Sequence, residues 1–231
     1  TIDKTTRLFH QIGSGTTPKL IEESISNGTI HWIQSGDIKG DCLQNTKLKI
    51  MQDVVEKTSS LKVYKAPFIV IAMYGASIGN SAISIIDACV NQACCILAKP
   101  SSTINLDFAF YATVLTKDYL IWKSDGGGQP NISQEKIKNV WYPIPTDEEQ
   151  NKIVTILKLQ CSRTDALIAN NEAQIEKLKQ YKQSLITEVV TKGLDPTVPM
   201  KDSGVEWVDN TPSTWCPIRL KHCTYIRARL G

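Results

Sequence analysis

Near-continuous runs of apolar residues mark the strands in the first half of this chain. The clearest is Phe68-Ile69-Val70-Ile71-Ala72-Met73-Tyr74, with Pro67 before it and Gly75 after it. An apolar run between turn residues is typical of a strand that is buried on both faces. Similar segments predict further strands, and we expect them at residues 30–33, 82–86 and 91–97.

Helical patterns and loop signals complete the first part of the chain. Apolar residues at spacings of three to four predict a helix at residues 107–120, and a serine cap predicts a short helix at residues 134–138. Residues 48–56 fit either a strand edge or a short helix, whereas Gly, Thr and Pro in residues 12–20 predict a loop. The pattern therefore predicts an α+β globular domain over residues 1–145.

A single very long helix is predicted next. Thr146 stands three residues before Glu149, which is the spacing of a capping box, and Lys192-Gly193 is a typical helix end. Neither Gly nor Pro interrupts the residues between them. We expect one helix within residues 146–194, and about 46 residues at ~1.5 Å each give a length of roughly 70 Å. Such a helix is typical of a spacer.

The long helix carries an apolar heptad seam that we expect to be buried against a second helix. Cys161, Thr164, Asn171 and Lys182 weaken the seam, which favours antiparallel pairing over an ideal two-stranded zipper. An isolated helix of this kind is marginally stable, and the rest of the sequence predicts no second long helix. We therefore expect the partner helix to come from another subunit. The expected dimer contacts are Leu157, Ile168, Ile175, Leu178, Leu185 and Val189.

The chain begins to repeat itself after this helix. Arg7, Leu8 and His10 recur in the same order and spacing within the segment Arg219-Leu220-Lys221-His222. A short match of this kind gains meaning from its position beyond the spacer, where a second copy of the domain would begin. Residues 195–231 are therefore predicted to be the opening segment of a second domain.

Composition and charge describe an ordinary soluble protein. The 231 residues are 42% hydrophobic and 21% charged, with a formal net charge of +3. No apolar run approaches the length of a membrane span, and the first residues are no signal peptide. The 7 cysteines form no CxxC pair, and no histidine has ligand spacing to them. We expect buried thiols, no metal site and a cytoplasmic location.

Several short motifs follow one another in a family-specific order. They include the segment Ile12-Gly13-Ser14-Gly15-Thr16-Thr17-Pro18, the segment Gly36-Asp37-Ile38, the junction Pro143-Ile144-Pro145 with Glu148-Glu149-Gln150, and residues 165–168, 185–194, 200–207 and 212–215. Together they resemble the specificity subunit of type I DNA restriction-modification systems. The resemblance extends over the whole chain.

The resemblance implies a half-length subunit. The family's full-length subunit has two target-recognition domains and two spacer helices, whereas this chain has one of each and the start of a second domain. The resemblance leaves open that residues 203–231 complete a recognition domain instead. A homodimer packed helix to helix would then read a bipartite site on double-stranded DNA. The resemblance further implies methyltransferase (modification) and endonuclease/translocase (restriction) subunits as partners. These would carry S-adenosylmethionine, ATP and Mg²⁺, with no cofactor on this chain.

A DNA-reading surface needs cations for phosphates and polar groups for base edges. Residues 74–80 and 123–131 are the strongest candidates, because their glycines permit close approach of the backbone to a phosphate. Ordinary solvated surface is the alternative for each residue taken singly. The candidate contacts are Lys19, Gln34, Lys39, Tyr74, Ser77, Asn80, Lys123, Gln129 and Asn131.

Motifs of an independent enzyme are missing. The triple glycine at residues 126–128 lacks the Gly-Lys-Ser/Thr ending of a phosphate-binding loop, and Ser133 is better explained as a helix cap than as a nucleophile. No Asn-Pro-Pro-Tyr or Asp-Pro-Pro-Tyr of an amino-methyltransferase occurs. We expect a non-catalytic DNA-recognition subunit. The alternative is a self-associating adaptor that binds protein and not DNA.

Overall fold

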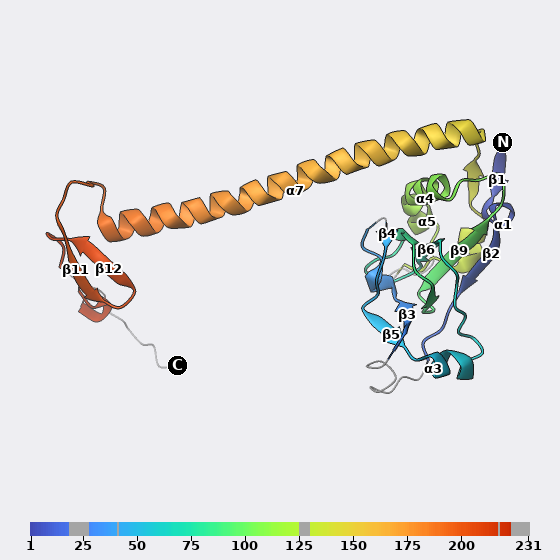
Figure 1. The fold of residues 1–231 in the computed structure, drawn as a ribbon, viewed down its shortest axis with the longest axis horizontal. Coiled ribbons are helices and arrows are strands. Elements are labelled where there is room, and N and C mark those ends of the chain that lie inside the picture. The colour runs from blue at the N-terminus through green and yellow to red at the C-terminus, as the bar shows by residue number, and fades with distance from the viewer. Residues whose placement is uncertain (19–27, 41, 125–129, 217, 223–231) are drawn as a thin grey trace. The chain divides into compact units, whose positions relative to one another are not determined.

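The computed structural model describes residues 1–18, 28–40, 42–124, 130–216 and 218–222. The chain divides into two compact units, Thr1–Leu159 and Gln160–Gly231. Figure 1 shows the elements of both units. The first unit contains the strands and short helices that were predicted as the globular domain, together with the first turns of the long helix.

A five-stranded sheet forms the centre of the first unit. Its order is β2 (Phe9–Ser14), β9 (Cys94–Pro100), β6 (Phe68–Ala72), β7 (Ser81–Ser84) and β4 (Cys42–Leu43). Neighbouring strands run antiparallel, except that β4 pairs parallel with β7. The central strand β6 therefore has no free edge.

Strand β6 explains the near-continuous apolar run. Ile69 and Ile71 pack into one core cluster with Phe108 and Leu120, whereas Phe68, Val70 and Ala72 pack into a second cluster on the opposite face. Because successive side chains of a strand point to opposite faces, a strand covered on both sides needs apolar residues throughout. The predicted strand is confirmed.

A smaller sheet covers part of the second cluster. Its order is β5 (Leu48–Ile50), β3 (Ile30–Ile33) and β8 (Ala88–Val90), and β3 has the predicted bounds. Residues 48–56, predicted as either a strand edge or a short helix, form both, because β5 is followed by helix α3 (Gln52–Lys57). Trp32 and Ile50 are buried together in a third cluster.

Short helices pack against the other face of the large sheet. They are α4 (Leu106–Leu115), α5 (Lys117–Trp122) and α6 (Gln134–Lys138), and Ser133 caps α6 as predicted. The prediction of one helix over residues 107–120 was wrong. The helix is interrupted at Thr116, whose Oγ1 donates to the carbonyl of Thr113 at 2.8 Å.

Three strand boundaries also differ from the predictions. Residues 12–14 belong to β2 and not to a loop. The strand expected at residues 82–86 is β7, which ends at Ser84, and the strand expected at residues 91–97 starts only at Cys94. Residues 91–93 form a turn, since the Asn91 carbonyl accepts from Cys94 N at 3.2 Å and Asn91 Oδ1 accepts from Ala93 N at 3.0 Å.

The N-terminal residues pair with the segment that leads into the long helix. Strand β1 (Ile2–Lys4) pairs antiparallel with β10 (Trp141–Pro143), and the short helix α1 (Thr5–Leu8) follows β1. The Thr5 hydroxyl is buried and donates to the Ile137 carbonyl at 2.7 Å. These contacts hold both ends of the domain together.

The long helix is confirmed as α7 (Asp147–Lys192). Thr146 Oγ1 accepts from Glu149 N at 3.4 Å, which is one half of the predicted capping box. Gly193 has a φ of +79° and donates from its N–H to the Val189 carbonyl at 3.0 Å. A glycine adopts this left-handed conformation without strain, so the predicted helix end is also confirmed.

A β-hairpin follows α7 in the second unit. Strands β11 (Met200–Val205) and β12 (Val208–Pro212) pair antiparallel, and a 3₁₀ turn, η2, covers Leu220–His222. Trp207 is exposed at the hairpin turn, whereas Val208 is buried. None of the helices in the described residues has both the length and the apolar character needed to cross a bilayer.

Candidate nucleic-acid interface

The β6–β7 turn, residues 73–80, gathers two other segments around it. The N–H of Met73 donates to the Ala93 carbonyl at 2.7 Å, and the Met73 carbonyl accepts from Ile132 N at 2.7 Å. The turn is closed by Gly79 N donating to the Ala72 carbonyl at 2.8 Å. Residues 91–93 and 131–132 are thus fixed beside the turn, which places the end of the second candidate segment next to the first.

Two further predicted segments lie at this end of the sheet. Asn91 N donates to the Ile33 carbonyl at 3.0 Å, which attaches the 3₁₀ turn η1 (Ser35–Asp37). Ser14 Oγ donates to the Cys94 carbonyl at 2.7 Å, and Thr17 Oγ1 bonds Gln92 Oε1. The loop cluster therefore comprises residues 14–18, 34–40, 73–80, 91–93 and 130–132, together with the adjoining start of α5.

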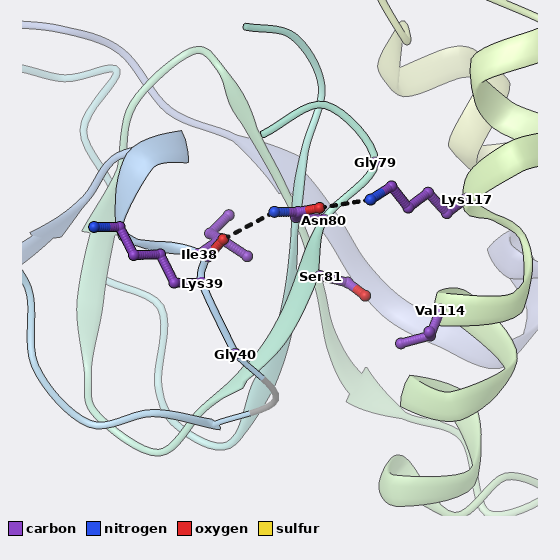
Figure 2. A pocket seen from close by; sticks show the side chains of 8 residues that line it. All are labelled: Ile38, Lys39, Gly40, Gly79, Asn80, Ser81, Val114 and Lys117. Atoms are coloured by element: carbon purple, nitrogen blue, oxygen red, sulfur yellow. Dashed lines mark hydrogen bonds between the residues drawn. The ribbon is translucent and has the colours of Figure 1, made fainter. Parts of the chain in front are cut away.

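A small pocket of about 200 Å³ opens within the loop cluster. Figure 2 shows Asn80 between the other groups that line it. Asn80 Nδ2 donates to the Ile38 carbonyl at 3.2 Å, and Asn80 Oδ1 accepts from Lys117 Nζ at 2.9 Å. The lining residues are Ile38, Lys39, Gly40, Gly79, Asn80, Ser81, Val114 and Lys117.

The predicted DNA contacts are distributed unequally over this cluster. Lys39 and Asn80 line the pocket. Gln34 is half-buried at the start of η1, where its N–H donates to Asp37 Oδ2 at 2.9 Å. Ser77 is half-buried, and its carbonyl accepts from Asn80 N at 2.9 Å inside the turn. Lys19 and Gln129 lie outside the described residues.

Tyr74 is half-buried and packs against the first core cluster. Burial raises the pKa of its hydroxyl, and a hydrogen bond with Gln92 acts in the opposite direction. The side chain therefore serves the core and also presents its hydroxyl group to the loop cluster.

The end of α5 carries an exposed aromatic pair that the sequence reading did not single out. Tyr119 and Trp122 have ring centroids 6.4 Å apart, and Lys123 Nζ lies 4.8 Å from the Trp122 ring. Lys123 and Asn131 are both exposed, at either side of residues 125–129. A cation over an aromatic face keeps its charge available to solvent and ligands.

Lys117 is the main residue that sequence reasoning missed. When residues 107–120 are predicted as one helix, nothing in the sequence indicates that Lys117 belongs to the loop cluster. The interruption at Thr116 begins a new helix at Lys117, and this lysine then reaches Asn80 from a different element. Thr116, a polar residue within an apolar helical stretch, was the sequence feature that could have indicated the break.

Gln150 was not singled out either, although it anchors α7 to the domain. Its side chain is 1% exposed, and its Oε1 accepts from Asn105 N at 2.8 Å. Its Nε2 donates to the carbonyls of Thr103 at 3.0 Å and Pro145 at 3.1 Å. Lys158 adds an ion pair with Asp107 at 2.8 Å. The first turns of α7 are therefore fixed to the N-terminal unit.

The heptad seam remains largely uncovered along α7. Ile168, Ile175, Leu178 and Leu185 are exposed, whereas Leu157 and Val189 are half-buried. Val154, which precedes Leu157 by three residues on α7, packs into the first core cluster of the domain. The uncovered part of the seam thus begins after Val154.

Comparison with known proteins identifies the family. The sequence profile described as "Type I restriction modification DNA specificity domain" matches residues 8–177. This chain belongs to that family. The match includes the whole loop cluster and the first two-thirds of α7, so both lie within the specificity domain.

Two curated proteins of Methanocaldococcus jannaschii are similar in sequence. The type I restriction enzyme MjaIX specificity subunit is 28% identical over 174 residues, which cover 74% of this chain and 39% of that protein. A protein named as the MjaX specificity subunit is 30% identical over 103 residues, covering 45% of this chain and 23% of that protein. The chain therefore spans less than half the length of these relatives.

Solved structures share the fold. One comes from work on complex assembly and conformational transition of the type I R-M system, with a TM-score of 0.68 and 16% identity over 84% of this chain and 46% of that chain. The HsdS subunit from Thermoanaerobacter tengcongensis has a TM-score of 0.58 and 16% identity over 81% of this chain and 44% of that chain. The predicted fold, a mixed α/β domain followed by a long helix, is confirmed.

Proposed function

We propose that this chain recognises one half of a bipartite target on double-stranded DNA for a type I restriction-modification complex. The family match over residues 8–177 is the observation that carries the proposal. The loop cluster supports it, because lysines, amides and hydroxyls from several segments meet at one end of a rigid sheet. A scaffold that fixes loop side chains in this way suits recognition of a duplex.

The long helix supports a homodimer. Exposed Ile168, Ile175 and Leu178 form an apolar stripe that an equivalent helix would cover in antiparallel packing. A two-fold dimer presents two identical recognition domains, and it would therefore read inverted half-sites. The separation of the half-sites then depends on the helix pair.

The remaining surface of α7 is the proposed docking site for modification subunits. These and the restriction subunits are proposed to supply catalysis with S-adenosylmethionine, ATP and Mg²⁺, while this chain selects the target. The tight anchoring of Gln150 supports this role, because a scaffold transmits position only if its elements are held rigidly.

Duplex binding at several salt concentrations tests the proposal. The chain is purified with its modification subunit, and its affinity for a short duplex is measured between about 50 and 200 mM salt by fluorescence anisotropy. We expect a steep linear decrease of log affinity with log salt, because bound phosphates release counterions. Methylome sequencing of cells that carry both subunits should then show a bipartite, palindromic motif.

The adaptor function gives the opposite result. A self-associating adaptor would bind no duplex, or would bind it with an affinity that changes little with salt. Methyl transfer by the purified chain alone would also contradict the proposed role, because it would place the chemistry on this chain.

A further inference from the structure

The pocket of Figure 2 has a geometry that suits a phosphate better than a base. We propose that it binds one phosphodiester of the DNA backbone, with Lys117 as its cation and Asn80 as a positioning residue. This inference rests on the proposed function. It assigns to the pocket a contact that contributes affinity and register but no sequence information.

The Asn80 amide is already committed within the protein. Its Nδ2 group donates to the Ile38 carbonyl and its Oδ1 atom accepts from Lys117, so contacts within the protein fix the orientation of the amide. Reading an adenine edge requires an amide that presents its oxygen and its nitrogen together to the base. We therefore infer that Asn80 holds Lys117 and the Ile38 segment in position and does not contact a base. Among the candidate DNA contacts it is then a positioning residue.

Lys117 is held in place without losing its charge. Its hydrogen-bond partner is a neutral amide oxygen at 2.9 Å, which orients the ammonium group but does not neutralise it. A lysine ammonium has three donors, so two remain after this bond. An oxyanion is the ligand that this arrangement favours.

Gly79 explains how Lys117 approaches the turn so closely. Its φ is +76°, and a Cβ atom built there would lie 2.7 Å from Lys117 Cγ. A larger residue would be strained and would displace the lysine stem. Glycine therefore lets the aliphatic part of Lys117 lie directly on the β6–β7 turn.

Lys39 also lines the pocket, but Figure 2 shows its side chain extending away from Asn80 and Lys117, so it is not counted as a ligand of the phosphate. Lys39 is exposed and directly follows Ile38, whose carbonyl accepts the Asn80 amide. A volume of about 200 Å³ exceeds that of several waters at ~30 Å³ each, which leaves room for a phosphate group with its solvent. The eight lining residues in Figure 2 include no aromatic ring on which a base would stack.

The test replaces the lysine charge in the complex with the modification subunit. Lys117→Gln should weaken binding to target and non-target duplexes by the same factor, about tenfold at low salt. It should also reduce the slope of log affinity against log salt by roughly 0.9, the value for one lost phosphate contact. The methylated motif should stay unchanged, and Lys117→Arg should retain most of the slope.

Asn80 variants test the positioning role. Asn80→Asp keeps an acceptor for Lys117 but adds a negative charge, so the salt slope should fall as in Lys117→Gln. Asn80→Ala should weaken binding in the wild-type background but add little to Lys117→Gln, because both act through one contact. Lys57→Gln is the matched control, since Lys57 is an exposed lysine paired with Asp53 on α3, and it should leave the slope unchanged.

The results distinguish a failure of the proposed function from a failure of the phosphate site. A wild-type complex without salt-dependent duplex binding would overturn the proposed function. Normal wild-type binding with an unchanged slope in both Lys117→Gln and Asn80→Asp would overturn only the phosphate site. A changed methylation motif in Lys117→Gln would also overturn it, because a phosphate contact carries no sequence information.

Discussion

At the scale of single residues, the cysteines show how position within a strand decides reactivity. Cys94 and Cys95 are neighbours in β9, but they pack into opposite core clusters. Burial, with smaller effects of Asp37 and Cys95, raises the pKa of the Cys94 thiol to about 12. Burial likewise raises the pKa of Cys95 to about 12 and that of Cys89 to about 11. The expectation of buried thiols holds for these three, whereas Cys42 and Cys216 are exposed.

Alkylation of the native protein checks this difference. At pH 8 iodoacetamide should modify Cys42 and Cys216 at least tenfold faster than Cys89, Cys94 and Cys95, because the thiolate is the reactive form. Mass spectrometry of peptides gives the extent at each site. In urea all five sites should react at similar rates. Fast modification of Cys94 in the folded protein would contradict the buried core.

At the scale of elements, one buried glutamine connects the recognition domain to its helix. Gln150 is one of only a few buried polar residues in the described part of the chain, and its three side-chain hydrogen bonds join α7 to residues of the domain or of the preceding loop. A buried amide is stabilising only when its partners are present. The direction of the first turns of α7 therefore depends on this side chain.

Gln150→Ala should lower the free energy of unfolding of the N-terminal unit by about 1 to 3 kcal/mol, because Asn105 N and the Thr103 carbonyl lose their partner. Urea denaturation followed by tryptophan fluorescence measures the change. Gln160→Ala is the control, since Gln160 is an exposed glutamine of the same helix, and it should change the stability by less than about 0.5 kcal/mol. Equal stability of the two variants would show that the anchor contributes nothing.

At the scale of the whole molecule, the uncovered seam of α7 determines assembly. Replacing both Ile175 and Leu178 by Asp should convert the proposed dimer into monomers, because each carboxylate would be buried at the helix interface. Light scattering measures the mass. The control places the same charges outside the seam, in Ala173→Asp with Gln180→Asp, and should remain dimeric. A seam variant that stays dimeric would show that the subunits associate through another surface.

The sequence alone determined the local elements and their order. The β6 run, the Ser133 cap, Thr146 and Gly193 act through neighbours a few residues away, so their patterns are readable without a fold. The interruption at Thr116 was not read, because an apolar spacing continues across it.

Only the tertiary structure decided which of these residues meet. The bond of Lys117 to Asn80 joins positions 37 residues apart, that of Asn80 to Ile38 spans 42, and that of Gln150 to Asn105 spans 45. The pairing order of the sheet brings such residues together, and no periodicity within a segment encodes it. The sequence therefore predicted a recognition domain followed by a spacer helix. The packing of the sheet and its helices determined that Lys117 lines a pocket and that Gln150 attaches the long helix to the domain.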